Sequence, residues 1–216
     1  MRRNVGGISV PTLRRLPMYH AHLKKAAEQG RSFVSCTHIA AALDLVPIQV
    51  RKDLHSAGID GKPRVGYAVP DLIQSLEDFL GWNNISEAYL VGAGDLGAAL
   101  LGYRGFNDHG LDIVAAFDID PRKIGRKIHG KDVYPLEKLA PLVKRNGVLI
   151  GILAVPRAAA QDVADILVRA GIRAIWNFTS VRITVPAAII VQHENLASSL
   201  AVLSRRLAQS LERSPS

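Results

Sequence analysis

Hydrophobic and polar residues follow two different patterns along the chain, and the pattern changes near residue 80. Before this point, apolar residues recur every three or four positions, as on one face of a helix. Candidate helices cover residues 11–30, 38–45, 47–58 and 71–81. After it, short apolar runs alternate with helical segments, which is typical of a parallel sheet with right-handed helical crossovers. The pattern therefore predicts two units of different architecture.

The first three candidate helices begin at residues that suit helix starts. Ser35 or Thr37 can cap the second helix, because a hydroxyl accepts a hydrogen bond from a free backbone N–H. Pro47 opens the third, where a missing N–H has no cost. Residues 59–70 hold two β-prone runs with glycine turns, which predict a hairpin. Three helices and a hairpin form the order of a winged helix-turn-helix, whose third helix enters the major groove of DNA.

The second unit is predicted to be an α/β domain of the Rossmann type, with a doubly wound parallel sheet. Its strands are expected within residues 87–94, 111–120, 145–156, 172–179 and 187–193, and its helices at 95–103 and 157–171. A last helix, residues 194–213, carries leucine at positions 196, 200, 203, 207 and 211. This stripe has to be covered by its own domain or by another subunit. We divide the chain into residues 1–80, 81–193 and 194–216.

Positive charge is concentrated in the first third of the chain. Residues 1–70 hold 11 Lys or Arg against 4 Asp or Glu, a net charge of +7, whereas residues 71–216 hold 16 against 15. A basic excess in one small unit suggests a polyanionic partner, because neutralised phosphates release counterions. Together with the order of the elements, it favours binding of double-stranded DNA.

The composition indicates a folded, non-membrane protein without cysteine-based sites. With 48% hydrophobic and 21% charged residues, the chain can form a packed core. No apolar run approaches the roughly 20 residues that a membrane span needs, so we expect no membrane partner and a cytoplasmic protein. Cys36 is the only cysteine, which excludes an intrachain disulfide and a cysteine metal cluster.

Several polar residues of the third helix and the hairpin suit contacts with DNA. Gln49 can pair with adenine and Arg51 with guanine. Lys52 suits a phosphate, and Lys62 and Arg64 could reach the backbone or a minor groove.

The stretch VGAGDLGAALLGY, residues 91–103, carries the G-x-G-x-x-G spacing of a dinucleotide-binding turn. Gly92 would allow the tight turn, Gly94 the approach of a pyrophosphate, and Gly97 the contact between helix and strand. Asp118 ends the next strand and can bind the ribose hydroxyls, which favours NAD over NADP. Asp95 follows the second glycine, where its carboxylate would repel a pyrophosphate unless it points away or caps the helix.

We find no convincing catalytic constellation in the sequence. Tyr134 and Lys138 have the Y-x-x-x-K spacing of some reductases, but Pro135 follows the tyrosine and the match is best read as chance. The seven histidines form no metal pattern. We therefore expect a DNA-binding unit joined to a unit that binds a nucleotide cofactor and performs no chemistry. The alternatives are a small NAD-dependent oxidoreductase with an accessory basic domain, and a regulatory module that binds CoA or another nucleotide.

Motifs along nearly the whole chain resemble one known family. They are PTLRRLP, QVRKDL, GKPRVGY, VGAGDLGAALLGYRGF, AAFDIDPRKIG, VPRAAAQDVAD and AGIRAIWNF, followed by the closing helix. On these residues the chain resembles the Rex family of redox-sensing transcriptional repressors. The resemblance implies a homodimer whose last helix is swapped between subunits. It also implies binding to a palindromic operator that NADH releases and NAD⁺ permits.

The resemblance also assigns residues to the two sites. Those expected to bind DNA are Arg15, Gln49, Arg51, Lys52, Lys62 and Arg64. Those expected to bind NADH or NAD⁺ are Gly92, Ala93, Gly94, Asp95, Leu96, Gly97, Tyr103, Asp118, Ile119, Val155, Pro156, Asn177 and Phe178, of which Tyr103 would lie near the nicotinamide and take part in switching.

This sequence departs from the family pattern at a few positions. Ala21 replaces an arginine of the first helix, Glu194 replaces an aspartate that pairs with it, and Asn195 replaces an apolar residue near the nicotinamide. Thr179 and Ser180 replace Ala-Pro. We expect these changes to affect the selectivity between NADH and NAD⁺ rather than the fold.

Overall fold

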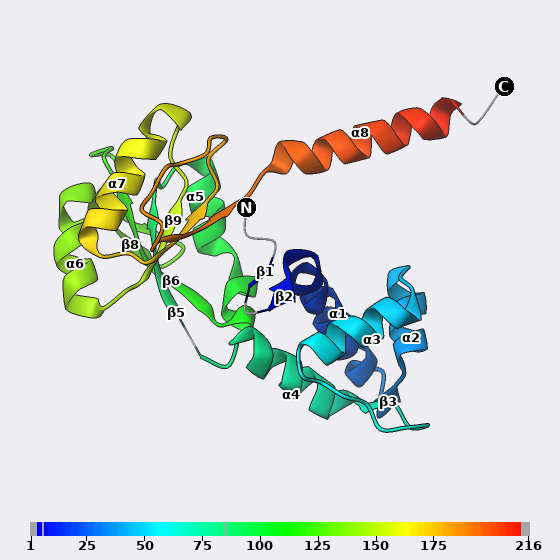
Figure 1. Ribbon diagram of the computed structural model, residues 1–216. Coiled ribbons are helices and arrows are strands. Elements are labelled where there is room, and N and C mark those ends of the chain that lie inside the picture. Colours follow the sequence, from blue (N-terminus) through cyan, green and yellow to red (C-terminus); the bar gives the residue numbers. More distant parts are fainter. Residues whose placement is uncertain (1–3, 6, 85, 213–216) are drawn as a thin grey trace. The chain divides into compact units, whose positions relative to one another are not determined.

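A computed structural model describes residues 4–5, 7–84 and 86–212 of the chain. It divides into two compact units, Met1–Asn84 and Ile85–Ser216 (Figure 1). The division predicted at residues 80 and 81 falls just before this boundary. The last helix, predicted as a separate segment, falls within the second unit.

Helices dominate the first unit. Its elements are β1 (Asn4–Val5), β2 (Ile8–Ser9), α1 (Val10–Glu28), β3 (Phe33–Val34), α2 (Cys36–Leu43), α3 (Pro47–Ser56), β4 (Tyr67–Ala68) and α4 (Val69–Leu80). Apolar residues of all four helices, among them Leu16, Ile39, Leu54 and Leu76, are fully buried in one cluster. The helical spacing of these residues is what made the elements predictable.

Serine side chains cap the first two helices. The Ser9 hydroxyl accepts a hydrogen bond from the Thr12 N–H, and the Ser35 hydroxyl accepts one from the His38 N–H. The capping role predicted for Ser35 is confirmed, and α2 begins two residues earlier than expected. Val46 occupies the cap position of α3 and makes no side-chain capping bond.

The hairpin predicted over residues 59–70 is shorter than expected, and we call residues 59–68 the wing. Lys62 and Gly66 form a single antiparallel bridge around a tight turn. The strand that follows, β4, pairs with β3 through Phe33–Ala68 and Val34–Tyr67. At Gly66, with φ at +87°, a Cβ would lie 2.3 Å from the Val34 carbonyl oxygen. The wing is therefore anchored to the start of α2, which sequence periodicity could not reveal.

The second unit contains a seven-stranded sheet in the order β11-β10-β9-β5-β6-β8-β7. Its strands are β5 (Ser86–Val91), β6 (Leu111–Asp118), β7 (Lys127–Ile128), β8 (Lys131–Pro135), β9 (Ile150–Leu153), β10 (Ala174–Asn177) and β11 (Ile190–His193). Six strands are parallel, and only the edge strand β7 is antiparallel to its neighbour. In chain order the parallel strands lie 3-2-1-4-5-6, which is the Rossmann order. The predicted fold class is confirmed.

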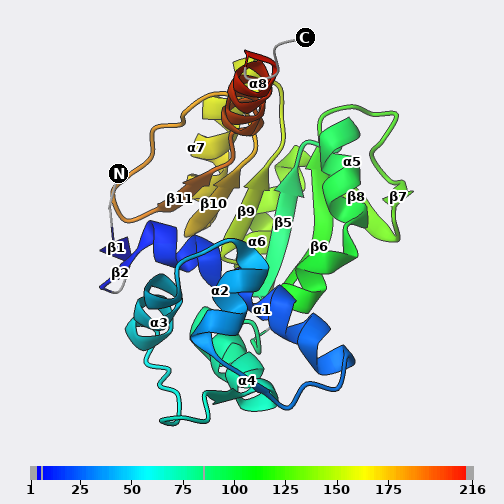
Figure 2. The ribbon, with the colours of Figure 1, turned by 90° about the vertical axis from the view of Figure 1, so that its right-hand side faces the viewer.

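Helices cover both faces of this sheet (Figure 2). They are α5 (Asp95–Gly102), α6 (Leu139–Asn146) and α7 (Ala160–Ala170), with 3-10 helices η1 (Arg104–His109), η2 (Leu136–Lys138) and η3 (Arg157–Ala159). Tyr89 and Val91 of β5 pack with α6 and α7, whereas Ala88 and Leu90 pack on the face that holds Leu101 of α5. This two-sided burial explains why the central strands are continuous apolar runs.

Several elements of the second unit differ from the sequence prediction. Residues 145–146, predicted to begin a strand, are the last residues of α6, and β9 starts only at Ile150. Of strand β8, Lys131–Pro135, the sequence predicts only the end, since the stretch VYPLEKL (residues 133–139) reads as a strand end that enters a helix, and the strand's residues are only partly apolar. It pairs with β6 through contacts such as Phe117–Tyr134.

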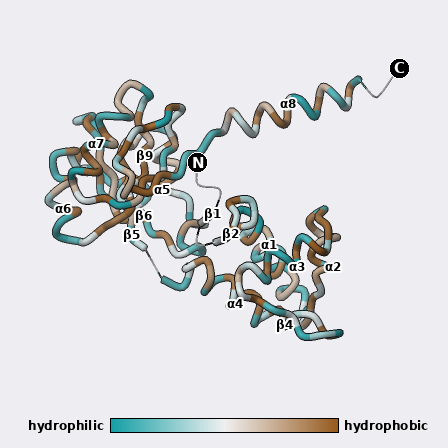
Figure 3. Tube along the Cα trace, in the orientation of Figure 1, coloured by the Kyte–Doolittle hydropathy of each residue, from teal (hydrophilic) through white to brown (hydrophobic). Residues whose placement is uncertain are grey.

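The last helix, α8 (Leu196–Glu212), exposes apolar side chains in the single chain. Hydrophobic and hydrophilic residues alternate along it (Figure 3). Four leucines are more than half exposed: Leu200, Leu203, Leu207 and Leu211. In this chain alone they remain uncovered by other residues. No helix among the residues described is long and apolar enough to cross a membrane.

Candidate DNA-binding surface and dinucleotide site

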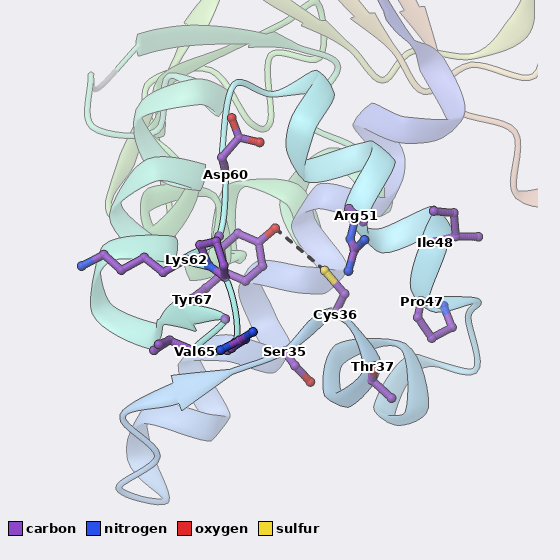
Figure 4. A pocket seen from close by; sticks show the side chains of 14 residues that line it. Ser35, Cys36, Thr37, Pro47, Ile48, Arg51, Asp60, Lys62, Val65 and Tyr67 are labelled. Carbon is purple, nitrogen blue, oxygen red and sulfur yellow. Dashed lines mark hydrogen bonds between the residues drawn. The ribbon is translucent and has the colours of Figure 1, made fainter.

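A groove of about 740 Å³ runs between the starts of α2 and α3 and the wing (Figure 4). Arg51 of α3 and Lys62 and Arg64 of the wing line it. At its floor, Cys36 and Tyr67 are in contact, with the sulfur 3.8 Å from the phenolic oxygen. The structure thus gathers three of the cations predicted to bind DNA around one concave surface.

These cations are available to a ligand. Arg51, Lys52, Lys62 and Arg64 are all exposed, and in the described part of the chain none of their side chains forms an ion pair. Asp60, the acid that lines the groove, pairs instead with His55, whose Nδ1 lies 2.9 Å from the carboxylate. Exposed cations without acidic partners are the feature that binds phosphates.

Two other residues predicted to touch DNA have partners inside the unit. Arg15 donates through Nε and Nη2 to both carboxylate oxygens of Asp53, at 2.6 and 2.8 Å. Gln49 donates through its amide to the same carboxylate at 2.9 Å. Their contact with DNA stays a prediction. Arg15 Nη1 and the side-chain oxygen of Gln49 take no part in these bonds to Asp53. The sequence did not predict their internal role.

Asp53 is the centre of this polar cluster and the residue that sequence reasoning missed. It is 1% exposed, and it also accepts hydrogen bonds from the hydroxyls of Thr12 and Tyr19. Burial opposes its charge, but the donors, led by Arg15, hold its pKa below the usual value. The carboxylate therefore ties α1 to the helix predicted to read DNA.

The Gly-rich turn of the second unit has the geometry expected of a dinucleotide site. Gly92 has φ at +99°, and a Cβ there would lie 2.4 Å from the Ala154 carbonyl oxygen. A Cβ on Gly97 would lie 1.9 Å from the Gly92 carbonyl oxygen. Around Gly94 there is open space. Two glycines are thus required by the fold itself, and the third leaves room for a phosphate group at the start of α5.

Asp118 holds this turn in place. Its Oδ2 accepts from the Ala93 N–H at 2.8 Å and from Lys123 at 3.1 Å, and its Oδ1 accepts from the Asp120 N–H at 2.8 Å. These donors lower its pKa although burial opposes ionisation. The carboxylate has few lone pairs left for a ribose. The structure shows its hydrogen bond to Ala93 of the turn, and its direct contact with a ligand stays a prediction.

A cavity of about 240 Å³ lies beside the turn, between the carboxyl ends of β5 and β9. In an open parallel sheet, ligands bind at this reversal of strand order. Of the predicted residues, it is lined by Gly92, Gly94, Asp118, Ile119, Val155 and Pro156. Lys123, which the sequence did not single out, also lines it. The signal that could have identified Lys123 is its position, five residues after Asp118 at the end of β6.

The first turn of α5 carries two other predicted residues. Asp95 is exposed, and the cap residue of α5 is Gly94, so the suggested capping role of Asp95 is wrong. Leu96, 40% exposed, lies beside it.

Three predicted residues lie away from this cavity. Tyr103 lines a separate cavity of about 330 Å³ with Phe106 and His129. An aromatic chain links it through Phe106 and Trp176 to Phe178, with ring centroids 4.8, 5.4 and 4.9 Å apart.

Asn177 is fully buried, and its amide nitrogen donates to the Val181 carbonyl oxygen and contacts His193 Nδ1. Its oxygen accepts from Thr179, through both the backbone N–H and the hydroxyl. Asn177 therefore shapes the loop after β10. The side chain has no polar atom left for a ligand in this arrangement, and its assignment to the cofactor stays a prediction.

Two of the residues that depart from the family pattern, Glu194 and Asn195, have internal partners. Glu194 accepts a hydrogen bond from the Trp176 indole N–H at 2.9 Å. The side-chain oxygen of Asn195 accepts from the Ser198 N–H at 3.2 Å, so Asn195 caps α8. Asparagine is favoured at such caps, which explains the polar residue at this position.

Tyr134 and Lys138, whose Y-x-x-x-K spacing is read as chance, lie next to each other in the structure. The Lys138 ammonium lies over the Tyr134 ring, 5.8 Å from its centroid. Their spacing places them in a cation–π contact at the end of β8. Among the described residues, no group of three or more His, Cys, Asp or Glu side chains could hold a metal ion.

Comparisons with known proteins agree with this division into two units. A family model described as "Putative DNA-binding protein N-terminus" matches residues 7–55, and a "CoA binding domain" model matches residues 83–181. The redox-sensing transcriptional repressor Rex of Treponema denticola is 52% identical over 195 residues, which cover 90% of this chain and 93% of that protein. The Rex of Bacteroides fragilis is 44% identical over 197 residues, covering 91% and 90%.

Solved structures are similar over the same extent. RSP in complex with β-NAD⁺ and operator DNA has a TM-score of 0.88 and 35% sequence identity, covering 94% of both chains. RSP in complex with β-NADH has a TM-score of 0.86 and 35% identity, covering 94% of this chain and 95% of that one.

Proposed function

This chain belongs to the Rex family of redox-sensing transcriptional repressors, and from that premise we propose that it is a DNA-binding repressor that responds to the NADH/NAD⁺ ratio. It binds a palindromic operator through its first unit. NADH bound in the second unit releases the operator, whereas NAD⁺ permits binding. The protein acts as a sensor and performs no chemistry on the nucleotide.

One observation carries this proposal: a single chain joins unpaired cations around a winged-helix groove to a Rossmann crevice with an open glycine. The cations suit phosphates of DNA, and the space at Gly94 suits a pyrophosphate. The two features belong to separate compact units of the chain. Their presence together supports a protein that converts occupancy of one site into affinity at the other.

The proposal includes a homodimer. A palindromic operator has two half-sites, which a two-fold symmetric protein matches. The exposed leucines of α8 support it, because an apolar face of this kind requires a cover, and a second copy supplies one. We also expect a cytoplasmic location, where operator DNA and the nicotinamide pool meet.

Operator binding measured during titration with NADH or NAD⁺ tests the proposal. NADH should weaken binding at a concentration at which NAD⁺ does not. The Gly94→Ala variant separates the two sites: it should bind the operator as the parent does and lose its response to NADH, because the new methyl group occupies the space for the pyrophosphate. Operator binding that ignores both nucleotides would contradict the sensor.

A rival ligand follows from the match of residues 83–181 to the CoA-binding model. CoA and NAD share a pyrophosphate attached to an adenosine, so the same turn could hold either. Calorimetry with CoA, ATP and NADH distinguishes them. Tight binding of CoA with no heat from NADH would favour a CoA-responsive regulator.

A further inference from the structure

Two exposed aliphatic side chains, Val46 and Ile48, stand at the start of α3. We propose that they recognise the C5-methyl groups of thymines in the operator. This inference rests on the proposed function, because it requires α3 to enter the major groove. It adds apolar base recognition to the polar contacts predicted for Gln49 and Arg51.

The core of the unit does not need these side chains. Val50 and Leu54, on the inner face of α3, are fully buried and complete the contact with α1 and α2. Val46 and Ile48 remain 61% and 53% exposed. Figure 4 shows Ile48 on the outer side of α3, beside Pro47 at the start of the helix.

Valine is also an unfavourable residue at the start of a helix. Val46 holds the cap position of α3 with φ at −94° and ψ at 132°, where Ser, Thr, Asn or Asp would accept a backbone hydrogen bond. The neighbouring helices α1 and α2 both use serine in this way. Helix α3 lacks that bond, as does α4, which starts after Ala68, but at α3 the residue in this position is a large apolar side chain that stays exposed.

The surroundings of the two side chains point to DNA as the occupant. Arg51 and Lys52 lie three and four positions after Ile48 on α3. Arg51 lines the groove together with Lys62 and Arg64 of the wing. A purely apolar partner would leave these cations uncompensated. A polyanion that also offers apolar groups satisfies both requirements.

Thymine is the base that offers such a group in the major groove. Its C5-methyl is the apolar feature on the base edges there, and small aliphatic side chains contact it. The residues that approach base edges are those at the amino-terminal end of the reading helix. Val46 and Ile48 occupy that end, so the placement and the chemistry agree.

Replacing single operator thymines with deoxyuridine tests this directly, because it removes one methyl group and changes no hydrogen bond. We expect at least one position in each half-site where deoxyuridine weakens binding of the parent protein about fourfold, as burial of a methyl group predicts. The Ile48→Ala or the Val46→Ser variant should bind the thymine operator more weakly by a similar factor and lose sensitivity to deoxyuridine at that position.

Val46→Ser guards against loss of fold, because serine supplies the missing helix cap. Met18→Ala is the matched control: Met18 is an exposed apolar residue of α1, outside the groove, and its variant should keep the deoxyuridine sensitivity of the parent.

Two results would overturn the inference. In one, deoxyuridine has no effect at any position on the parent protein while the operator is still preferred over unrelated DNA. In the other, the two variants and the parent respond to it equally. If the parent shows no preference for the operator at all, the proposed function fails, and this inference fails with it.

Discussion

Among the described residues, each unit contains one buried carboxylate whose pKa is lowered, and the two differ in the source of their hydrogen-bond donors. Asp53, 1% exposed, receives hydrogen bonds from four side chains, three of them on a different helix. Asp118, 8% exposed, receives two from backbone N–H groups near the Gly-rich turn and one from Lys123. One carboxylate joins helices, whereas the other holds a loop.

The two sets of hydrogen-bond donors hold their candidate binding sites in different ways. Side-chain donors on α1 orient α3 as a rigid body, and Gln49 is held by the same carboxylate as Arg15. Backbone donors instead fix the path of the main chain around Gly92 and Gly94, where a ligand would meet N–H groups rather than side chains. Damage to Asp53 should therefore affect DNA, and damage to Asp118 should affect the nucleotide.

Asp53→Ala should produce the largest effect. Without the carboxylate, the half-buried guanidinium of Arg15 and the buried hydroxyl of Tyr19 lose their partner, and breaking a buried pair costs about 3–5 kcal/mol. We expect this loss in the free energy of unfolding measured with urea. Operator binding should fall with it. Tyr19→Phe, which removes one bond and keeps the ring, should cost clearly less. Equal stability of Asp53→Ala and the parent would refute the comparison.

Asp118→Asn should have an intermediate effect confined to the second unit. Loss of the charge weakens the bonds from Ala93 N–H and Lys123, and hydrogen bonds to charged groups contribute about 1.5–3 kcal/mol. NADH affinity should fall about tenfold or more, while operator binding without nucleotide stays at the parent level. Calorimetry and a DNA-binding assay on one preparation measure both. Loss of DNA binding alone would reverse the assignment of the two carboxylates.

The glycines of the turn allow a matched pair of variants. Gly97→Ala places a methyl group 1.9 Å from a backbone oxygen, so overpacking should cost about 1–3 kcal/mol in unfolding free energy. Gly94→Ala meets no atom within 4 Å and has φ at −75°, so stability should change by less than about 0.5 kcal/mol. Both variants should lose NADH binding. A Gly94→Ala variant that binds NADH normally would exclude a pyrophosphate at this turn.

The smallest predicted effect is a pH dependence of the free energy of unfolding that comes from His22 of α1. Its Nε2 is buried and has no hydrogen-bond partner among the described residues, and it packs against His38 with ring centroids 5.7 Å apart. Burial, followed by the charges of His38, Arg31 and Lys25, lowers its pKa from 6.5. Because the folded state then binds fewer protons, stability is fully present above pH 6.5 and declines as the pH falls below it.

His22→Gln should flatten this decline, measured as the free energy of unfolding at about pH 7 and about pH 5.5. The two carboxylates lose their contribution only at more acidic pH, below their ordinary pKa of 3.8, since their folded pKa values are lowered. An unchanged pH profile in His22→Gln would assign the decline to another group, such as His193, whose pKa burial also lowers.

The local sequence was sufficient for much of this molecule. Helical spacing predicted α1 to α4, the glycine spacing predicted the turn after β5, and the apolar runs predicted the parallel sheet. Each of these features depends on residues that are close in the chain, through caps, steric limits on φ, or burial of one helix face. The concentration of positive charge before residue 70 could likewise be read from the sequence without the structure.

The tertiary structure alone decided which partners the polar residues take. Arg15 and Asp53 are 38 positions apart, and Ala93 and Asp118 are 25 apart, so no periodic pattern connects them. It also decided that β4 pairs with β3, that Tyr103 and Asn177 lie outside the cavity of the turn, and that Val46 and Ile48 stay exposed. These outcomes depend on how separate elements pack, because a buried charge takes whichever donors the fold brings within reach.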